Sequence, residues 1–130
     1  MIEQPLILVV DDMLETRRLM RRVLERNRFT VIEAGTGEEG LLAIEKDRPE
    51  LVVLDLRLPG MSGFDVARAV RSSSDQDVAL TVLLACSASI QPEVQREAME
   101  AGCNAFEGKP FDIIEFPHRV RGLIAQNRRR

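Results

Sequence analysis

The sequence predicts a doubly wound α/β fold in which five parallel strands alternate with helices. Short apolar runs and amphipathic helical patterns alternate five times over 130 residues, a length that suits one compact domain. The runs at 6–10, 51–54 and 78–85 are almost continuously apolar, as is typical of strands buried on both faces. Right-handed crossovers between such strands predict a sheet of order 2-1-3-4-5 covered by helices on both sides.

Hydrophobic periodicity places the first two strand–helix units. A strand at 6–10 precedes a helix at 13–27, whose apolar positions recur at helical spacing: Leu14, Leu19, Met20, Val23 and Leu24. A second strand at 29–32 precedes a helix that ends near residue 47, and Thr36 with Glu39 three positions later fits a capping box at its start. Within that helix the residues expected to face the core are Leu41, Leu42 and Ile44.

Turn residues and further apolar runs divide the rest of the chain. The expected elements are a strand at 51–54, a helix from Ser62 or Gly63, a loop at 72–77, a strand at 78–85, a helix from Pro92 to Gly102, a strand at 104–107 and a helix at about 112–125. Pro92 suits a first helical turn and Gly102 suits a helix end. Pro117 is tolerated in the last helix only near its first turn.

Composition and charge narrow the class of protein. The chain is 45% apolar and 30% charged, which is ordinary for a globular domain. No apolar stretch is long enough to span a bilayer, and residues 1–5 carry an acid and no basic residue, so we expect a cytoplasmic protein without membrane insertion. Cys86 and Cys103 lack metal-binding spacing and are expected to be buried hydrophobic residues. The net charge of −3 argues against direct binding of nucleic acid.

The distribution of arginine suggests how the chain is organised. Residues 1–127 are expected to form a single domain, and the arginines at 128–130 a basic tail or the start of a linker. A second group of arginines lies early in the chain, at positions 17, 18, 21, 22, 26 and 28. This group fits either a solvated helix face or a docking surface for an acidic protein.

Polar residues follow four of the five predicted strands. Asp11 and Asp12 follow the first, Asp55 follows the third, Ser87 ends the fourth and Lys109 follows the fifth. Asp55 alone would fit either a turn cap or a functional group. Because the carboxyl ends of parallel strands lie at one edge of the sheet, we expect all five residues to converge there.

The residue types at this edge predict phosphoryl chemistry. Clustered carboxylates repel one another unless a divalent cation or a cationic side chain neutralises them. Oxygen-only ligands suit Mg²⁺, Lys109 supplies a positive charge for a phosphoryl oxygen, and Ser87 supplies a hydroxyl donor. Since an Asp carboxylate can accept a phosphoryl group covalently, Asp55 is the predicted nucleophile. A group of strand-end caps and ion pairs without activity is the other interpretation.

Four segments carry a resemblance to a known family: Val-Val-Asp-Asp at 9–12, the run from Asp55 to Gly63, Ser-Ala at 87–88 and Lys-Pro-Phe at 109–111. They resemble the receiver domains of bacterial two-component response regulators, of the chemotaxis-regulator-like type, and the resemblance extends from Leu6 to about Ala125. It implies a flavodoxin-like (βα)5 fold. It also implies that Asp55 accepts phosphate from a histidine kinase or a histidine phosphotransfer protein.

The resemblance assigns the remaining site residues. Asp12, Asp55 and the backbone carbonyl of Arg57 would bind Mg²⁺ directly, and Asp11 would act through a bound water. Lys109 would contact the phosphoryl group, and the Lys109–Pro110 bond is expected to be cis.

The resemblance also implies a switch. Ser87, beside Ala88, would move toward the phosphoryl oxygen, and Phe106 would turn inward to fill the space left behind. Family members often carry Tyr at the position of Phe106. Phe106 lacks the phenolic hydroxyl that such a Tyr would supply. The surface formed by the helix from Pro92, the strand at 104–107 and the last helix would then bind an output protein or a second copy of the chain.

Kinase docking is expected beside the site. The residues that the resemblance implies for this contact are Met13, Leu14, Arg17, Arg18, Arg21, Pro110 and Phe111.

Two other functions would use part of the same set of residues. A haloacid-dehalogenase-type phosphatase also uses a strand-end Asp with Mg²⁺, but it needs a second Asp at position 13, where this chain has Met13, and an acidic pair after the lysine, where Pro110 and Phe111 stand. A pseudo-receiver that binds proteins without phosphorylation would not need the full set of acids, Ser87 and Lys109.

Overall fold

The computed structural model describes residues 4–128 and contains one five-stranded parallel sheet of order β2-β1-β3-β4-β5. The predicted fold class and strand order are confirmed. The elements are β1 (Leu6–Val10), α1 (Leu14–Glu25), β2 (Thr30–Ala34), α2 (Gly37–Asp47), β3 (Leu51–Asp55), α3 (Gly63–Arg71), α4 (Gln76–Ala79), β4 (Val82–Ser87), α5 (Pro92–Ala101), β5 (Ala105–Gly108) and α6 (Glu115–Arg128).

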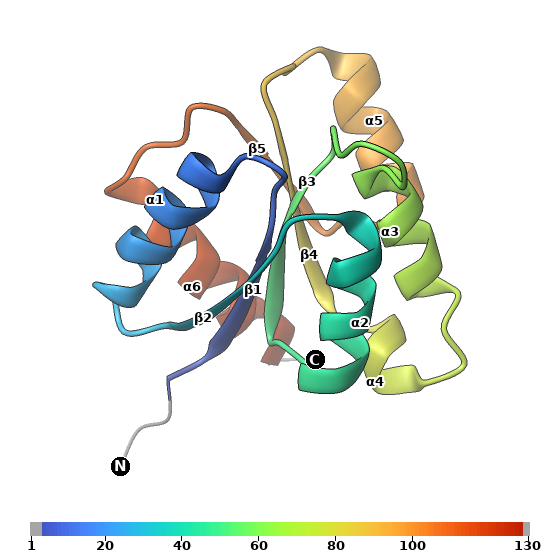
Figure 1. The fold of residues 1–130 in the computed structure, drawn as a ribbon, viewed down its shortest axis with the longest axis horizontal. Helices are drawn as coiled ribbons and strands as arrows, with labels where there is room; N and C mark the ends of the chain where they lie inside the picture. The colour runs from blue at the N-terminus through green and yellow to red at the C-terminus, as the bar shows by residue number, and fades with distance from the viewer. Residues whose placement is uncertain (1–3, 129–130) are drawn as a thin grey trace.

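Helices cover both faces of the sheet, so the molecule has three layers (Figure 1). α1 and α6 lie on one face, and α2, α3 and α5 lie on the other. Every residue of β3 and β4 is buried, as the continuous apolar runs predict for central parallel strands. Alternate strand residues pack into the two cores: Val9 and Val53 face α1 and α6, whereas Leu8 and Val52 face the other three helices.

The connection between α3 and β4 differs from the sequence-based expectation. Residues 72–77 were expected to form a loop and 78–85 a strand, but Gln76–Ala79 form the short helix α4 and β4 begins only at Val82. The side chain of Asp75 accepts a hydrogen bond from the N–H of Asp77 and caps this turn. Val78 is buried from within α4, which explains why its apolar character resembled the start of a strand.

Three helical leucines are exposed, although Leu42 was expected to face the core and Leu14 and Leu19 recur at the spacing of a buried helix face. Leu14 and Leu19 of α1 and Leu42 of α2 project outward, whereas Met20 and Leu24 are the buried residues of α1. The predicted cap of α2 forms only in part, because Thr36 accepts from the N–H of Glu39 while the Glu39 carboxylate accepts from Gly35. Helical spacing alone therefore overestimated the width of the buried stripe.

The last helix begins later and ends later than expected. Pro117 lies in the first turn of α6, where a proline is tolerated. Arg128, expected to begin a tail, is the final residue of α6 and forms an ion pair with Glu50; residues 129 and 130 lie outside the described part of the chain. No helix within residues 4–128 is both long and apolar enough to cross a membrane.

Both cysteines match their predicted role. Cys86 in β4 and Cys103 before β5 are buried free thiols. Burial raises the pKa of Cys86 to about 12 and that of Cys103 to about 11, so neither thiol is a nucleophile near neutral pH.

Candidate phosphoryl-transfer and metal site

The strand register brings the predicted site residues to one edge of the sheet. Val10 pairs with Leu54, which places Asp11 and Asp12 beside Asp55. Ser87 pairs with Gly108, and the N–H of Lys109 donates to the Ser87 carbonyl at 2.8 Å.

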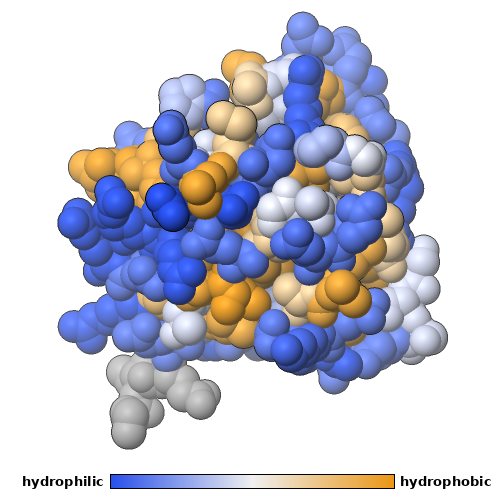
Figure 2. Space-filling model, viewed as in Figure 1, coloured by the Kyte–Doolittle hydropathy of each residue, from blue (hydrophilic) through white to orange (hydrophobic). Residues whose placement is uncertain are grey.

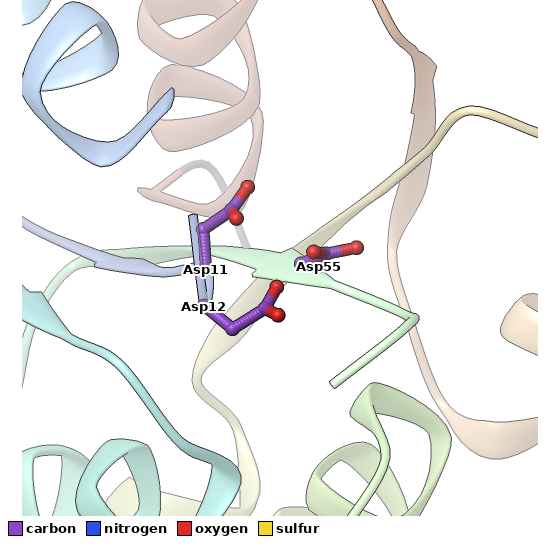
Figure 3. A group of neighbouring side chains, drawn as sticks. All are labelled: Asp11, Asp12 and Asp55. Atoms are coloured by element: carbon purple, nitrogen blue, oxygen red, sulfur yellow. The ribbon is translucent and has the colours of Figure 1, made fainter. Parts of the chain in front are cut away.

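The three aspartates form a compact acidic cluster. Figure 3 shows their side chains leaving the ends of β1 and β3 at the same edge of the sheet. One carboxylate oxygen from each of Asp11, Asp12 and Asp55 lies within 4.8 Å of the others. Asp11 and Asp55 are buried, with 1% and 5% of their surface exposed, whereas Asp12 faces solvent.

Lys109 partly neutralises this cluster. Its ammonium donates to Asp11 Oδ2 at 2.8 Å and lies 3.3 Å from Asp55 Oδ2. Burial by itself would lower the pKa of Lys109, but the hydrogen bond to Asp11 and the charge of Asp55 raise it overall. Burial raises the pKa of Asp55, against the opposing N–H of Arg57 and the charge of Lys109. With all groups ionised the four side chains carry two net negative charges, which a divalent cation would balance.

The strand-end loops hold these carboxylates in place. The N–H of Met13 donates to Asp11 Oδ1 at 2.9 Å, and the N–H of Arg57 donates to Asp55 Oδ1 at 3.1 Å. α3 begins directly against the end of β3. The backbone at Gly63 lies so close to β3 that a Cβ there would overlap the carbonyl oxygen of Asp55. The capping box of Ser62 and Asp65 fixes the start of that helix.

The residues of the expected switch lie where β4 and β5 end. Ser87 is buried, and its Oγ accepts a hydrogen bond from the N–H of Ser89 at 3.1 Å. Ala88 is exposed at the rim of the site, and Phe106 is half-buried against the core on the α5 side. The Lys109–Pro110 peptide bond is cis, as expected.

The early arginines do not form a single free surface. Arg17 and Arg21 of α1 both bind Glu33 of β2, at 3.0 and 2.8 Å, whereas Arg18 is exposed. Glu33 was not among the site residues predicted from the sequence. Its one visible signal is a lone acid in the otherwise apolar run at 31–34 of β2.

A small groove lies beside the acidic cluster, between α1 and the segment before α6. Its volume is about 310 Å³, and its lining residues are Thr16, Leu19, Ala88, Lys109, Pro110 and Phe111. Further apolar side chains are exposed in the chain segments next to the lining residues: Met13, Leu14, Ile113 and Ile114. Figure 2 shows the corresponding hydrophobic area at the upper left, over the connection that precedes α6.

Known proteins are similar to this chain in both sequence and fold. The response regulator MprA of Mycobacterium ulcerans is 38% identical over 122 residues, which cover 94% of this chain and 51% of that protein. The DNA-binding response regulator MtrA of Mycobacterium tuberculosis is 36% identical over 121 residues, covering 93% and 51%. The solved structure of the Vibrio cholerae chemotaxis protein CheY4 superposes with a TM-score of 0.86 at 25% identity, covering 92% of this chain and 98% of that one. The chain thus spans about half the length of the curated relatives it matches.

These relatives correct one expectation about partners. The acidic net charge led us to expect no direct binding of nucleic acid. That expectation is wrong for proteins of this kind, because relatives that match almost the whole chain are named DNA-binding response regulators. The net charge of one region says little about what the rest of a longer protein binds.

The match to a family model agrees with the geometry of the site. The model of the response regulator receiver domain matches residues 7–121, which include the acidic cluster, Ser87 and Lys109. Receiver domains are signalling domains of two-component systems and typically use Mg²⁺ at an acidic pocket. By its sequence, strand order and strand-end residues, this chain belongs to the response regulator receiver domain family.

Proposed function

We propose that this receiver domain is a signalling switch in which Asp55 accepts a phosphoryl group from a histidine kinase or a histidine phosphotransfer protein. The observation that carries the proposal is the convergence of Asp11, Asp12, Asp55 and Lys109 at the carboxyl edge of one parallel sheet. A carboxylate oxygen of Asp55 attacks the phosphorus, and the bond from phosphorus to the donor histidine breaks. The receiver unit was expected to end at residue 127, and with α6 it extends to Arg128. A cytoplasmic location is proposed because the phosphodonor is a kinase or phosphotransfer protein.

The acidic cluster fits Mg²⁺, which would draw charge away from the transferring phosphoryl group. Asp12, Asp55 and the backbone carbonyl of Arg57 would bind the ion directly, and Asp11 would act through a water. Lys109 and Ser87 donate to phosphoryl oxygens, and the small side chain of Ala88 leaves room beside them. The chain thereby takes part in its own phosphorylation and dephosphorylation, and does not act as an enzyme on another substrate.

Chemical phosphorylation tests the proposal without a kinase. Acetyl phosphate or phosphoramidate with Mg²⁺ should add one acid-labile phosphate, measured by intact-protein mass spectrometry, and Asp55→Asn should abolish it. Asp47→Asn, which changes an exposed acid of α2, is the matched control and should label normally. Label that persists in Asp55→Asn would remove Asp55 as the acceptor. No label on the wild-type chain would favour a pseudo-receiver.

The proposed output is a change in the surface of α5, β5 and α6. Arg119 of α6 donates to the Phe106 carbonyl at 3.1 Å and pairs with Glu107 at 3.2 Å, so a movement of Phe106 is linked to α6. Phosphorylation should therefore change amide hydrogen exchange in β5 and α6. Phe106→Ala should still be labelled at Asp55 but lose that change. Equal exchange changes in both proteins would contradict a role for Phe106.

The groove beside α1 is the proposed docking surface for the phosphodonor. Met13, Leu14, Pro110 and Phe111 supply apolar contacts next to Asp55, and Arg18 supplies an exposed charge. By likeness to MtrA, we infer that the switch would control DNA binding in a longer protein that contains this chain and a DNA-binding region.

A further inference from the structure

We propose that Arg17 is a positioning residue for the metal site: its guanidinium holds the loop that carries Asp11 and Asp12 against Glu33 of β2. The family resemblance implied that Arg17 contacts a kinase, but in the structure its side chain binds Glu33 and the Asp11 carbonyl. This inference rests on the metal-binding role proposed for Asp11, Asp12 and Asp55.

The guanidinium of Arg17 bridges two elements that are separate in the chain. Nη1 donates to the backbone carbonyl of Asp11 at 2.7 Å, and Nε donates to Glu33 Oε1 at 3.0 Å. The other oxygen of Glu33 accepts from Arg21 at 2.8 Å, so the acid itself is held from two sides. The Arg17 side chain is only 17% exposed, unlike the neighbouring Arg18.

The carbonyl that Arg17 binds belongs to a three-residue loop. Residues 11–13 connect β1 to α1, and the N–H of Asp11 already donates to the Ala34 carbonyl at 3.1 Å. The N–H of Met13 donates to the Asp11 carboxylate. Fixing the Asp11 carbonyl sets the plane of the peptide between Asp11 and Asp12. Arg17 therefore controls the direction in which Asp12, the solvent-exposed acid of the cluster, leaves the backbone.

The end of β2 leaves space for this arrangement. A Cβ on Gly35 would lie 3.2 Å from Arg17 Nη1, closer than side chains normally approach. Glu33 and Gly35 thus form two walls of a socket for the guanidinium. A planar group that donates along two fixed directions fits this socket, whereas the ammonium of a flexible lysine does not hold its donors in that fixed geometry.

Three roles for Arg17 predict different effects on Mg²⁺ affinity. A guanidinium that acts only by its charge repels a nearby cation, so its removal would strengthen Mg²⁺ binding. A guanidinium that only packs would change stability without changing affinity. A positioning residue should weaken Mg²⁺ binding when it is removed, because the outer partners of metal ligands set the geometry of those ligands.

Isothermal titration of Mg²⁺ into the unphosphorylated chain separates these roles. We expect Arg17→Met to raise the dissociation constant about tenfold, in the range known for partners of metal ligands. Arg17→Lys keeps the charge and should recover only part of this loss. Arg22→Met, an exposed arginine of the same helix, is the matched control and should bind like the wild type. Unchanged or tighter binding by Arg17→Met would overturn the proposal.

Two further measurements keep the result interpretable. Circular dichroism in EDTA checks that each variant folds. Glu33→Gln and Gly35→Ala disturb the socket less than Arg17→Met and should also weaken Mg²⁺ binding. If Arg17→Met does not fold, these two variants test the proposal. In acetyl phosphate labelling, Arg17→Met should need more Mg²⁺ for half-maximal rate but reach a similar maximal rate. If the wild type neither binds Mg²⁺ nor labels, the proposed function fails; if it does both and Arg17→Met matches it, only this inference fails.

Discussion

At the scale of single residues, Glu33 joins the edge strand β2 to helix α1. Its carboxylate accepts from Arg21 and Arg17, and these bonds hold the pKa of Glu33 below its ordinary value of 4.5 despite partial burial. A lowered pKa means that the folded state binds this proton less readily than the unfolded chain does. The stabilisation is therefore fully present above pH 4.5 and is lost as the pH falls through the lowered pKa.

Glu33→Gln should remove this contribution. We expect the free energy of unfolding at neutral pH to fall by about 1.5–3 kcal/mol, the usual range for hydrogen bonds to charged groups. The difference between wild type and variant should shrink toward acidic pH, which urea unfolding at several pH values between 3 and 7 would measure. A difference that stays constant over this range would show that the charge of Glu33 does not stabilise the fold.

The residues of the proposed phosphoryl-transfer site were predictable from the sequence, but the pairs around Glu33 were not. Asp11, Asp55 and Lys109 each follow an apolar strand, and parallel topology alone brings such positions together. The pairing of Arg17 with Glu33 depends on how α1 crosses β2, which residue spacing does not determine. The same arginine consequently resembled an exposed docking residue until its acceptors were known.

At the scale of elements, Arg71 ties the end of α3 to the neighbouring connections. Its guanidinium donates to the carbonyls of Gly102, Ala79 and Thr81 and to the side-chain oxygen of Asn104, at 2.7 to 2.8 Å. All four acceptors are uncharged, and burial lowers the pKa of Arg71. Arg71 therefore connects α3, the start of β4 and the turn before β5 through hydrogen bonds alone.

Arg71→Met should destabilise the fold by about 2–3 kcal/mol, because it leaves several carbonyls without their donor. Arg68→Met is the control on the same helix: Arg68 is exposed and forms surface ion pairs with Asp65 and Glu97, so its loss should cost less than about 1 kcal/mol. Chemical denaturation of both variants gives the comparison. Similar losses for Arg71 and Arg68 would mean that the hydrogen-bonded hub contributes no more than a surface pair.

The same region explains why one element boundary was mispredicted. Val78 precedes an apolar strand in the sequence, so pattern alone extended β4 toward it. The cap from Asp75 and the hydrogen bonds of Arg71 to the carbonyls of Ala79 and Thr81 instead favour a helical turn followed by a bend. Such tertiary contacts override local hydrophobicity at the start of β4. The existence of β3 and β4 was nevertheless predictable, because strands buried on both faces are continuously apolar in sequence.

At the scale of the whole molecule, the residues that stabilise the fold and the residues of the proposed site lie in different parts of the sheet. Its interior residues are aliphatic and close to fully buried, and its carboxyl edge collects the charged groups. Asp11 and Asp55 lie close together with Lys109 paired to both, so part of the stability supplied by the core is used to hold like charges in place. A cation that binds this edge should therefore be detected as an increase in the stability of the entire domain.

Mg²⁺ should raise the melting temperature of the chain, because an ion that binds only the folded state stabilises it by mass action. At ten times the dissociation constant the gain is about 1.4 kcal/mol. Asp12→Asn should lose most of this gain while melting at the same or a slightly higher temperature in EDTA, since it removes one exposed charge from a repelling cluster. Asp47→Asn should keep the full response. Thermal melts of the three proteins, with and without millimolar Mg²⁺, distinguish these outcomes, and a wild-type melt that does not respond to Mg²⁺ would contradict the acidic cluster as a metal site.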